Sequence, residues 1–221
     1  MIRAAIFDLD GTLLDTLDDL CQSTNRSCVA FGYAPRTREE VRVFLGDGVE
    51  KLIARALPEG ASNAAQVLAY FKQDYAAHCM DHTAPYPGVL PMLDRLNAHG
   101  IACAIVSNKF DPAVKTLSKH YFGDRIAFAV GESETVRRKP APDSVFSVLQ
   151  ALGCASRDAV YVGDSDVDIE TAKNACLPCF SVLWGFRDEQ FLRARGATVT
   201  VRTPDELTER FLTGRLSALR S

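Results

Sequence analysis

Two aspartates, Asp8 and Asp10, close an apolar run near the start of this 221-residue chain, in the segment IFDLDGTLLDT. The run is typical of a buried strand, and side chains two positions apart on a strand lie on the same face. At a separation of about 6 Å and an effective dielectric constant near 20, two such carboxylates repel by roughly 3 kcal/mol. We therefore expect either solvent or a compensating positive charge at this edge of the protein.

Other polar side chains also stand where apolar runs end: Ser107, Asn108 and Lys109, then Lys139 in the loop segment RRKPAPD, then Asp164 and Asp168. In an open parallel sheet, ligands bind at the carboxyl ends of the strands. Several acids that converge there suit a hard divalent cation, and magnesium prefers a few carboxylates with water and substrate oxygens. One acid then remains free to attack phosphorus while a neighbouring acid transfers protons, and Lys139, Ser107 and backbone amides hold the phosphoryl oxygens.

The elements that must position these groups alternate from residue 88 onward. Apolar patterns predict helices at 89–99, 111–120, 142–152 and 166–175 and strands at 101–107, 126–130, 159–163 and 179–183. Alternation with short links is typical of βαβ units, and nearly continuous apolar strands are typical of a sheet covered on both faces. We therefore predict an α/β fold, with a Rossmann-like parallel sheet core and helices on both faces.

The segment between the first strand and residue 84 has a different pattern. Its apolar residues recur at helical spacing, and it contains no convincing strand. We expect an inserted α-helical cap domain at 15–83 and an α/β catalytic core at 1–14 and 84–221. The insert is joined to the core twice, and two such links make a hinge for a lid.

Four segments in this order and spacing, DLDGTLLDT, VSNK, the lysine of RRKPAPD and GDSDVDIETA, resemble the four motifs of the haloacid dehalogenase superfamily in its phosphatase branch. The resemblance spans nearly the whole chain, and the insert looks like that superfamily's small helical cap. The segments DLDGTLLDTLDDL, FLGDGVEKLI, TAPYPGV and AIVSNK look most like the phosphoglycolate phosphatase group. The resemblance implies a magnesium-dependent phosphatase that hydrolyses a small phosphate monoester through an aspartyl-phosphate intermediate. The leading candidate for the substrate is 2-phosphoglycolate.

The resemblance also implies roles for the four acids. Asp8 is the expected nucleophile and a magnesium ligand. Asp10 is the expected acid and base and offers the metal its backbone carbonyl. Asp164 is the expected direct metal ligand, and Asp168 supports the metal, either directly or through water.

The remaining motif residues are expected to hold the substrate. Ser107 and Asn108 should bind phosphate, with Lys109 in the same substrate-binding set, and Lys139 should offset the charge of nucleophile and phosphate. One departure from the family pattern is Cys176, where relatives commonly have glycine after the fourth-motif helix. Asp166 is expected to cap that helix rather than to take part in catalysis.

The cap contains one candidate substrate loop, GDGVEK. Gly46 and Gly48 allow a close backbone approach, and Lys51 is placed to meet a substrate carboxylate when the lid closes. A plain loop at a helix start explains the same residues nearly as well. His78 and His82 stand four residues apart, but we expect a solvated helix face rather than a metal site.

Composition excludes several other classes of function. The chain has 25 basic and 28 acidic residues and a net charge of −3 without a basic stripe, so we expect no nucleic acid or membrane partner. We expect a small phosphorylated metabolite as partner, a cytoplasmic location, and a monomer or homodimer. Seven cysteines fit reduced thiols, and we expect the CLPC pair, Cys176 and Cys179, to have no redox role.

Three alternative functions are disfavoured, two of them by a single residue and the third by the complete motif set. A phosphosugar mutase of the same superfamily usually carries histidine about ten residues after the second aspartate, where this chain has Leu20. A dehalogenase typically lacks the acid that Asp10 supplies. A catalytically silent relative needs a broken motif, and every expected polar group is present. Inorganic pyrophosphate and phosphosugars remain open as phosphatase substrates.

Overall fold

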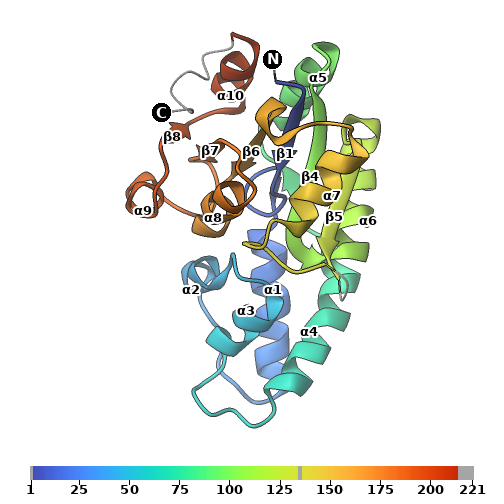
Figure 1. The fold of residues 1–221 in the computed structure, drawn as a ribbon. Coiled ribbons are helices and arrows are strands. Elements are labelled where there is room, and N and C mark those ends of the chain that lie inside the picture. Colours follow the sequence, from blue (N-terminus) through green and yellow to red (C-terminus); the bar gives the residue numbers. More distant parts are fainter. Residues whose placement is uncertain (1, 134–135, 214–221) are drawn as a thin grey trace. The chain divides into compact units, whose positions relative to one another are not determined.

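The protein is described by a computed structural model that covers residues 2–133 and 136–213 (Figure 1). It divides into two compact units, one formed by Met1–Leu14 with Pro85–Ser221 and the other by Asp15–Ala84. The chain passes between them through two short strands that pair with each other, β2 (Leu14–Asp15) and β3 (Ala84–Pro85). A hinge role for these links stays a prediction.

The first unit is built on a six-stranded sheet in the order β5-β4-β1-β6-β7-β8, and every recorded pairing in it is parallel. Its strands are β1 (Ala4–Phe7), β4 (Ala102–Phe110), β5 (Phe128–Glu132), β6 (Ala159–Gly163), β7 (Cys179–Val182) and β8 (Val199–Val201). The predicted α/β fold with a parallel core sheet is confirmed.

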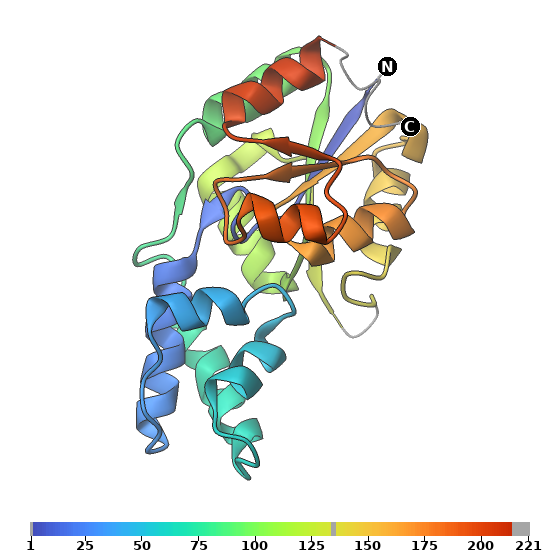
Figure 2. The same cartoon turned by 90° about the vertical axis from the view of Figure 1, so that its left-hand side faces the viewer.

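Helices cover both faces of this sheet. They are α5 (Val89–Ala98), α6 (Asp111–Phe122), α7 (Asp143–Ala151), α8 (Asp166–Asn174), α9 (Glu189–Ala194) and α10 (Pro204–Leu212), with single 3₁₀ turns at Gly123–Arg125 and Ser156–Asp158. Figure 2 shows α5, α6 and α10 on one side of the strands and α7 and α8 on the other. On the second side, α7 and α8 bury apolar residues against alternate residues of β1, β4 and β6. Such two-sided burial explains why the strands read as continuous apolar runs.

The second unit is helical, with α1 (Leu17–Ala30), α2 (Arg38–Phe44), α3 (Val49–Ala56) and α4 (Ala64–His78). The helix α2 begins at Thr37, whose hydroxyl accepts from the Glu40 N–H while the Glu40 carboxylate accepts from the Thr37 N–H. This reciprocal cap satisfies two backbone donors that a helix start leaves open. Asp19, buried in α1, accepts from the backbone N–H groups of His82 and Thr83 and fixes the returning chain within this unit.

Several predicted boundaries were wrong. The first strand stops at Phe7, so Asp8 and Asp10 follow the strand rather than lie in it, although the Asp8 N–H still donates to the Val162 carbonyl at 2.9 Å. The strand β4 runs on to Phe110, past the predicted end at residue 107, and β5 begins two residues later than predicted. Elements β8, α9 and α10 were not predicted. The three-residue β8 leaves too short a pattern, whereas the nine-residue α10, with Thr203 as its cap and Pro204 at its start, does carry a helix-start signal.

Two local predictions have clear outcomes at α8. The residue that caps this helix is Ser165, not Asp166, because the Ser165 hydroxyl accepts from the Asp168 N–H. After the helix, Cys176 has φ of 56°, a left-handed conformation that favours glycine, which explains why glycine suits that turn. The Cys176 and Cys179 thiols are free, and burial raises the pKa of Cys179.

Candidate active site

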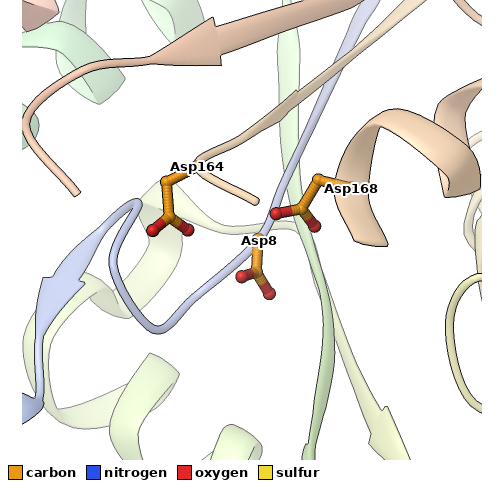
Figure 3. A group of neighbouring side chains, drawn as sticks. All are labelled: Asp8, Asp164 and Asp168. Atoms are coloured by element: carbon orange, nitrogen blue, oxygen red, sulfur yellow. The ribbon is translucent and has the colours of Figure 1, made fainter. Parts of the chain in front are cut away.

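Three carboxylates converge at the carboxyl edge of the parallel sheet (Figure 3). Because β1 and β6 are hydrogen-bonded neighbours, with Phe7 opposite Val162, the chain brings Asp8 beside Asp164 as soon as the two strands end. Asp168 lies in the first turn of α8. Each of the three offers an oxygen, and these oxygens lie within 4.8 Å of one another.

A single ammonium group links two of these acids. Lys139 Nζ lies 2.8 Å from Asp8 Oδ1, 2.8 Å from Asp168 Oδ1 and 3.1 Å from the Tyr161 hydroxyl oxygen. Burial by itself lowers the pKa of Lys139, but the carboxylates of Asp168 and Asp8 reverse that effect and hold the pKa well above its usual value. The lysine is therefore a fixed positive charge inside the site.

The acids carry more negative charge than this lysine offsets. Burial raises the pKa of Asp8 to about 7, against the opposing charge of Lys139 and with a further contribution from Asp168. Burial, followed by the charges of Asp168 and Asp8, also raises the pKa of Asp164 well above its usual value. Such elevated values mark a site that favours an added cation.

Asp164 is held in place by the loop that follows β1 and by the loop that follows β7. The Thr12 hydroxyl donates to its Oδ1 at 3.2 Å, and the Phe186 N–H donates to its Oδ2 at 2.7 Å. The Trp184 indole N–H donates to the Thr12 carbonyl at 2.9 Å and ties the two loops together. A Cβ on Gly185 would stand 2.2 Å from the Gly11 carbonyl oxygen, so this close approach requires glycine.

Asp168 is the most heavily hydrogen-bonded of the three acids, because each of its two oxygens accepts two hydrogen bonds. Its Oδ1 accepts from Lys139 at 2.8 Å and from Tyr161 at 3.2 Å, and its Oδ2 accepts from the Ser165 N–H at 3.1 Å and hydroxyl at 2.6 Å. It therefore caps α8 and fixes Lys139. Asp8 and Asp164 accept fewer hydrogen bonds and so leave more of their lone pairs open to a cation than Asp168 does.

The segment Ser107–Asn108–Lys109 lies where the register of β4 against β5 shifts, and all three residues are buried. The Asn108 side chain spans the backbone of Lys139, accepting from its N–H at 2.7 Å and donating to its carbonyl at 3.1 Å. Lys109 Nζ lies 2.8 Å from Asp10 Oδ1. The Ser107 hydroxyl accepts from the Lys109 N–H at 3.2 Å.

The predicted cap residues lie in the helical unit and are described within it alone. Gly46 and Gly48 have φ of 111° and 86°, and Gly48 directly precedes α3. Lys51 is exposed, with its Nζ 3.3 Å from Asp47 Oδ1. Their role in substrate binding stays a prediction. The histidines do not share a helix face, because α4 ends at His78; His78 pairs with Asp81, and His82 contacts Asp19.

Sequence reasoning missed several residues of the site: Thr12, Tyr161, Trp184, Gly185 and Phe186. The position of the WGF segment directly after a strand end is a signal that would have found the last three, because ligands gather at such ends. Tyr161 carries no such signal, since a buried tyrosine in an apolar strand is ordinary core.

The donor set fits a hard divalent cation. Asp8 and Asp164 present carboxylate oxygens from neighbouring strand ends, without histidine or cysteine, as magnesium prefers.

In the part of the chain that the structure describes, no helix is long and apolar enough to cross a membrane.

Comparison with known proteins is consistent with this geometry. The family model described as haloacid dehalogenase-like hydrolase matches residues 5–182. A phosphoglycolate phosphatase of Xylella fastidiosa (strain 9a5c) is 34% identical over 190 residues, which are 85% of this chain and 83% of that protein. One of Agrobacterium fabrum is 35% identical over 201 residues, covering 83% and 82%.

Solved structures share the fold over nearly the whole chain. A protein from Lactobacillus delbrueckii subsp. bulgaricus, provisionally assigned as a phosphoglycolate phosphatase, is 37% identical with a TM-score of 0.90, covering 94% of this chain and 97% of that one. CbbY from Rhodobacter sphaeroides, solved in complex with phosphate, is 26% identical with a TM-score of 0.75, covering 95% and 96%.

Proposed function

Because this chain belongs to the haloacid dehalogenase-like hydrolase family, we propose that it is a magnesium-dependent phosphatase that hydrolyses a small phosphate monoester through an aspartyl-phosphate on Asp8. The observation that carries this proposal is the buried Asp8 carboxylate, 2.8 Å from Lys139 and grouped with Asp164. A carboxylate held by a fixed ammonium beside a cation site is arranged to attack a phosphorus centre.

Asp8 and Asp164, with the backbone carbonyl of Asp10, would hold the magnesium ion. When bound, the ion supplies positive charge that neutralises the phosphoryl oxygens and keeps the acids ionised. Lys139 fixes one oxygen of Asp8, so the orientation of the nucleophile is set before substrate arrives. Such fixed orientation is worth several powers of ten in rate, because phosphoryl transfer depends mainly on positioning and charge.

Proton transfer falls to Asp10. In the first step, the bond from phosphorus to the leaving oxygen breaks, a bond to Asp8 forms, and protonated Asp10 gives its proton to the leaving oxygen. In the second step, a water molecule attacks phosphorus, its proton passes to the Asp10 carboxylate, and Asp8 is released. The two steps together convert a phosphate monoester and water into an alcohol and phosphate.

The buried Ser107 hydroxyl and nearby backbone N–H groups are proposed to bind the phosphoryl oxygens. Both polar atoms of the Asn108 side chain are hydrogen-bonded to the backbone of Lys139. Asn108 therefore supports phosphate binding by positioning that lysine. Lys139 itself offsets charge on nucleophile and phosphate.

For the substrate we propose 2-phosphoglycolate, which is supported by the names of the curated relatives at 34–35% identity. Gly46, Gly48 and Lys51 are the cap candidates for contact with its carboxylate. Other small phosphate esters share the same reacting group. We propose a cytoplasmic enzyme that acts as a monomer or homodimer on a small phosphorylated metabolite.

The test is phosphate release from a panel of small phosphate esters and pyrophosphate, with magnesium and with a chelator. We expect release that needs magnesium, is fastest with 2-phosphoglycolate, and is lost in Asp8→Asn. The matched control is Asp94→Asn, an exposed acid paired with Arg125, which should keep full activity. No release from any ester, or unchanged turnover in Asp8→Asn, would exclude the proposal.

A further inference from the structure

Lys109 carries a second buried ammonium group, besides that of Lys139. Its side chain is 4% exposed, and its Nζ lies 2.8 Å from Oδ1 of Asp10, whose side chain is 21% exposed. The two residues stand 99 positions apart in sequence, so the pairing is made by the tertiary fold. The motif to which Lys109 belongs had suggested contact with the substrate instead.

The path of β4 explains how Lys109 reaches Asp10. Successive side chains of a regular strand point to opposite faces. Here the register against β5 shifts between Val106 and Phe110, and the strand residues in between are all buried. Such an irregularity re-aims a side chain, and Lys109 is directed at the loop after β1.

We propose that Lys109 is a positioning residue for Asp10 rather than a ligand of the substrate phosphate. This inference rests on the proposed function, in which Asp10 transfers the proton. Within residues 2–133 and 136–213, the hydrogen bond of the Asp10 carboxylate is the one that its Oδ1 accepts from Lys109. Lys109 therefore holds one oxygen and leaves Oδ2 for the proton that passes to the leaving oxygen.

The energetics favour a lasting pair. A buried ammonium that loses its partner carries an uncompensated desolvation cost, and so does a carboxylate left behind in the same place. Moving Lys109 to the phosphate would also remove the contact that orients the Asp10 side chain, at the step in which Asp10 must be well oriented. Lys139 already supplies a fixed positive charge on the nucleophile side.

A role through Asp10 has a distinctive kinetic signature. Departure of an alkoxide needs a proton, whereas 4-nitrophenolate leaves well without one. The ratio kcat/KM reports the first chemical step, which depends on the leaving group. Hydrolysis of the phosphorylated Asp8 is the same for every substrate.

The experiment compares Lys109→Met with the unchanged protein on an alkyl phosphate and on 4-nitrophenyl phosphate, with magnesium. We expect kcat/KM for the alkyl ester to fall by about 10- to 100-fold, part of the 10²–10⁴-fold that acid–base catalysis contributes. For 4-nitrophenyl phosphate, we expect kcat/KM to stay within about 3-fold, because that step needs no proton. Adding Lys109→Met to Asp10→Asn should cause no further loss.

Two controls protect the interpretation. Lys115→Met removes an exposed lysine that pairs with Asp111 at 2.7 Å, and it should leave both substrates unaffected. If Lys109→Met does not fold, Lys109→Gln keeps a hydrogen-bond donor and should show a smaller loss with the same dependence on the leaving group.

The outcomes separate this inference from the proposed function. An equal fall in kcat/KM for both esters, additive with Asp10→Asn, would place Lys109 on the phosphate and overturn the inference while the phosphatase stands. An active enzyme in which Lys109→Met changes nothing would also overturn it. Absence of magnesium-dependent phosphate release from the unchanged protein would instead remove the proposed function.

Discussion

Replacing Asp164 with asparagine should stabilise the metal-free protein while it abolishes the response to magnesium. The side chain is 1% exposed, and its carboxylate shares the site with Asp8 and Asp168. An amide removes the charge and retains both hydrogen bonds, because its oxygen can accept from the Phe186 N–H while its nitrogen donates to the Thr12 hydroxyl.

The size of the effect follows from the spacing of the acids. Two unit charges 4.8 Å apart repel by about 3.5 kcal/mol at an effective dielectric constant of 20. Lys139 forms ion pairs with Asp8 and Asp168, and its positive charge offsets part of the repulsion between these two acids and Asp164. We therefore expect Asp164→Asn to raise the free energy of unfolding by about 2–4 kcal/mol at pH 8 with a chelator.

The effect should depend on pH in a defined direction. The pKa of Asp8 is raised from its usual 3.8 to about 7, and the pKa of Asp164 is raised in the same direction. Between pH 3.8 and about 7, the folded protein binds more protons at Asp8 than the unfolded chain does, so stability falls as pH rises. The advantage of Asp164→Asn should therefore grow from pH 4 to pH 8.

The same substitution at the neighbouring acid should have the opposite sign. Asp168 accepts four hydrogen bonds through its two oxygens, from Lys139, Tyr161 and the Ser165 N–H and hydroxyl. The amide oxygen of asparagine can keep only the two hydrogen bonds of one side, its nitrogen accepts none, and Lys139 also loses a counter-charge. Asp168→Asn should lower the free energy of unfolding by about 3–5 kcal/mol, the usual cost of breaking a buried ion pair.

The assay is urea denaturation of the three proteins at pH 4 and pH 8, with a chelator and with magnesium. Magnesium at 100 times its dissociation constant should stabilise the unchanged protein by about 2.7 kcal/mol and Asp164→Asn by far less. A metal-free Asp164→Asn protein that is less stable than the unchanged protein at pH 8 would refute the electrostatic account. Equal stabilisation of both by magnesium would remove Asp164 from the metal site.

Two further substitutions test the supports of the site. Asn108→Ala removes both side-chain hydrogen bonds to the backbone of Lys139. We expect the free energy of unfolding, measured by denaturation, to fall by about 1–3 kcal/mol for each buried group left unpaired, and kcat to fall as well. Gly185→Ala puts a Cβ 2.2 Å from the Gly11 carbonyl oxygen, so turnover should fall at least about 10-fold because 1 Å displacements at a site are costly. The control is Gly153→Ala, whose added Cβ meets no atom within 4 Å. It should lower stability, because Gly153 has a φ of 59°, but leave turnover unchanged. Equal losses of turnover in Gly185→Ala and Gly153→Ala would contradict this account.

Much of the fold was predictable because it is written in local patterns. Continuous apolar runs predicted β4 and β6, and their alternation with helical segments predicted the parallel sheet. The boundaries were less accurate, as at Phe7, where a strand ends although its hydrogen bonding continues by one residue. The strand β8 escaped prediction because three residues carry no periodicity.

The sequence by itself determined which chemical groups this protein has and roughly where they gather. Acids that follow apolar strands must meet at one edge of a parallel sheet, so Asp8 and Asp164 were predictable neighbours. The family motifs added the expectation that Lys139 offsets the charge of the nucleophile, and the structure has Lys139 Nζ 2.8 Å from Asp8 Oδ1.

Only the tertiary structure decided how these groups are paired. Lys109 is paired with Asp10, and the Asn108 side chain with the backbone of Lys139. The two oxygens of Asp168 accept from Lys139, Tyr161 and Ser165. Two of these contacts, Lys109 with Asp10 and Asn108 with Lys139, join residues 99 and 31 positions apart and come from the part of β4 where the register against β5 shifts. A linear pattern specifies the type and order of side chains, but long-range partners are set by packing, which leaves no local signal.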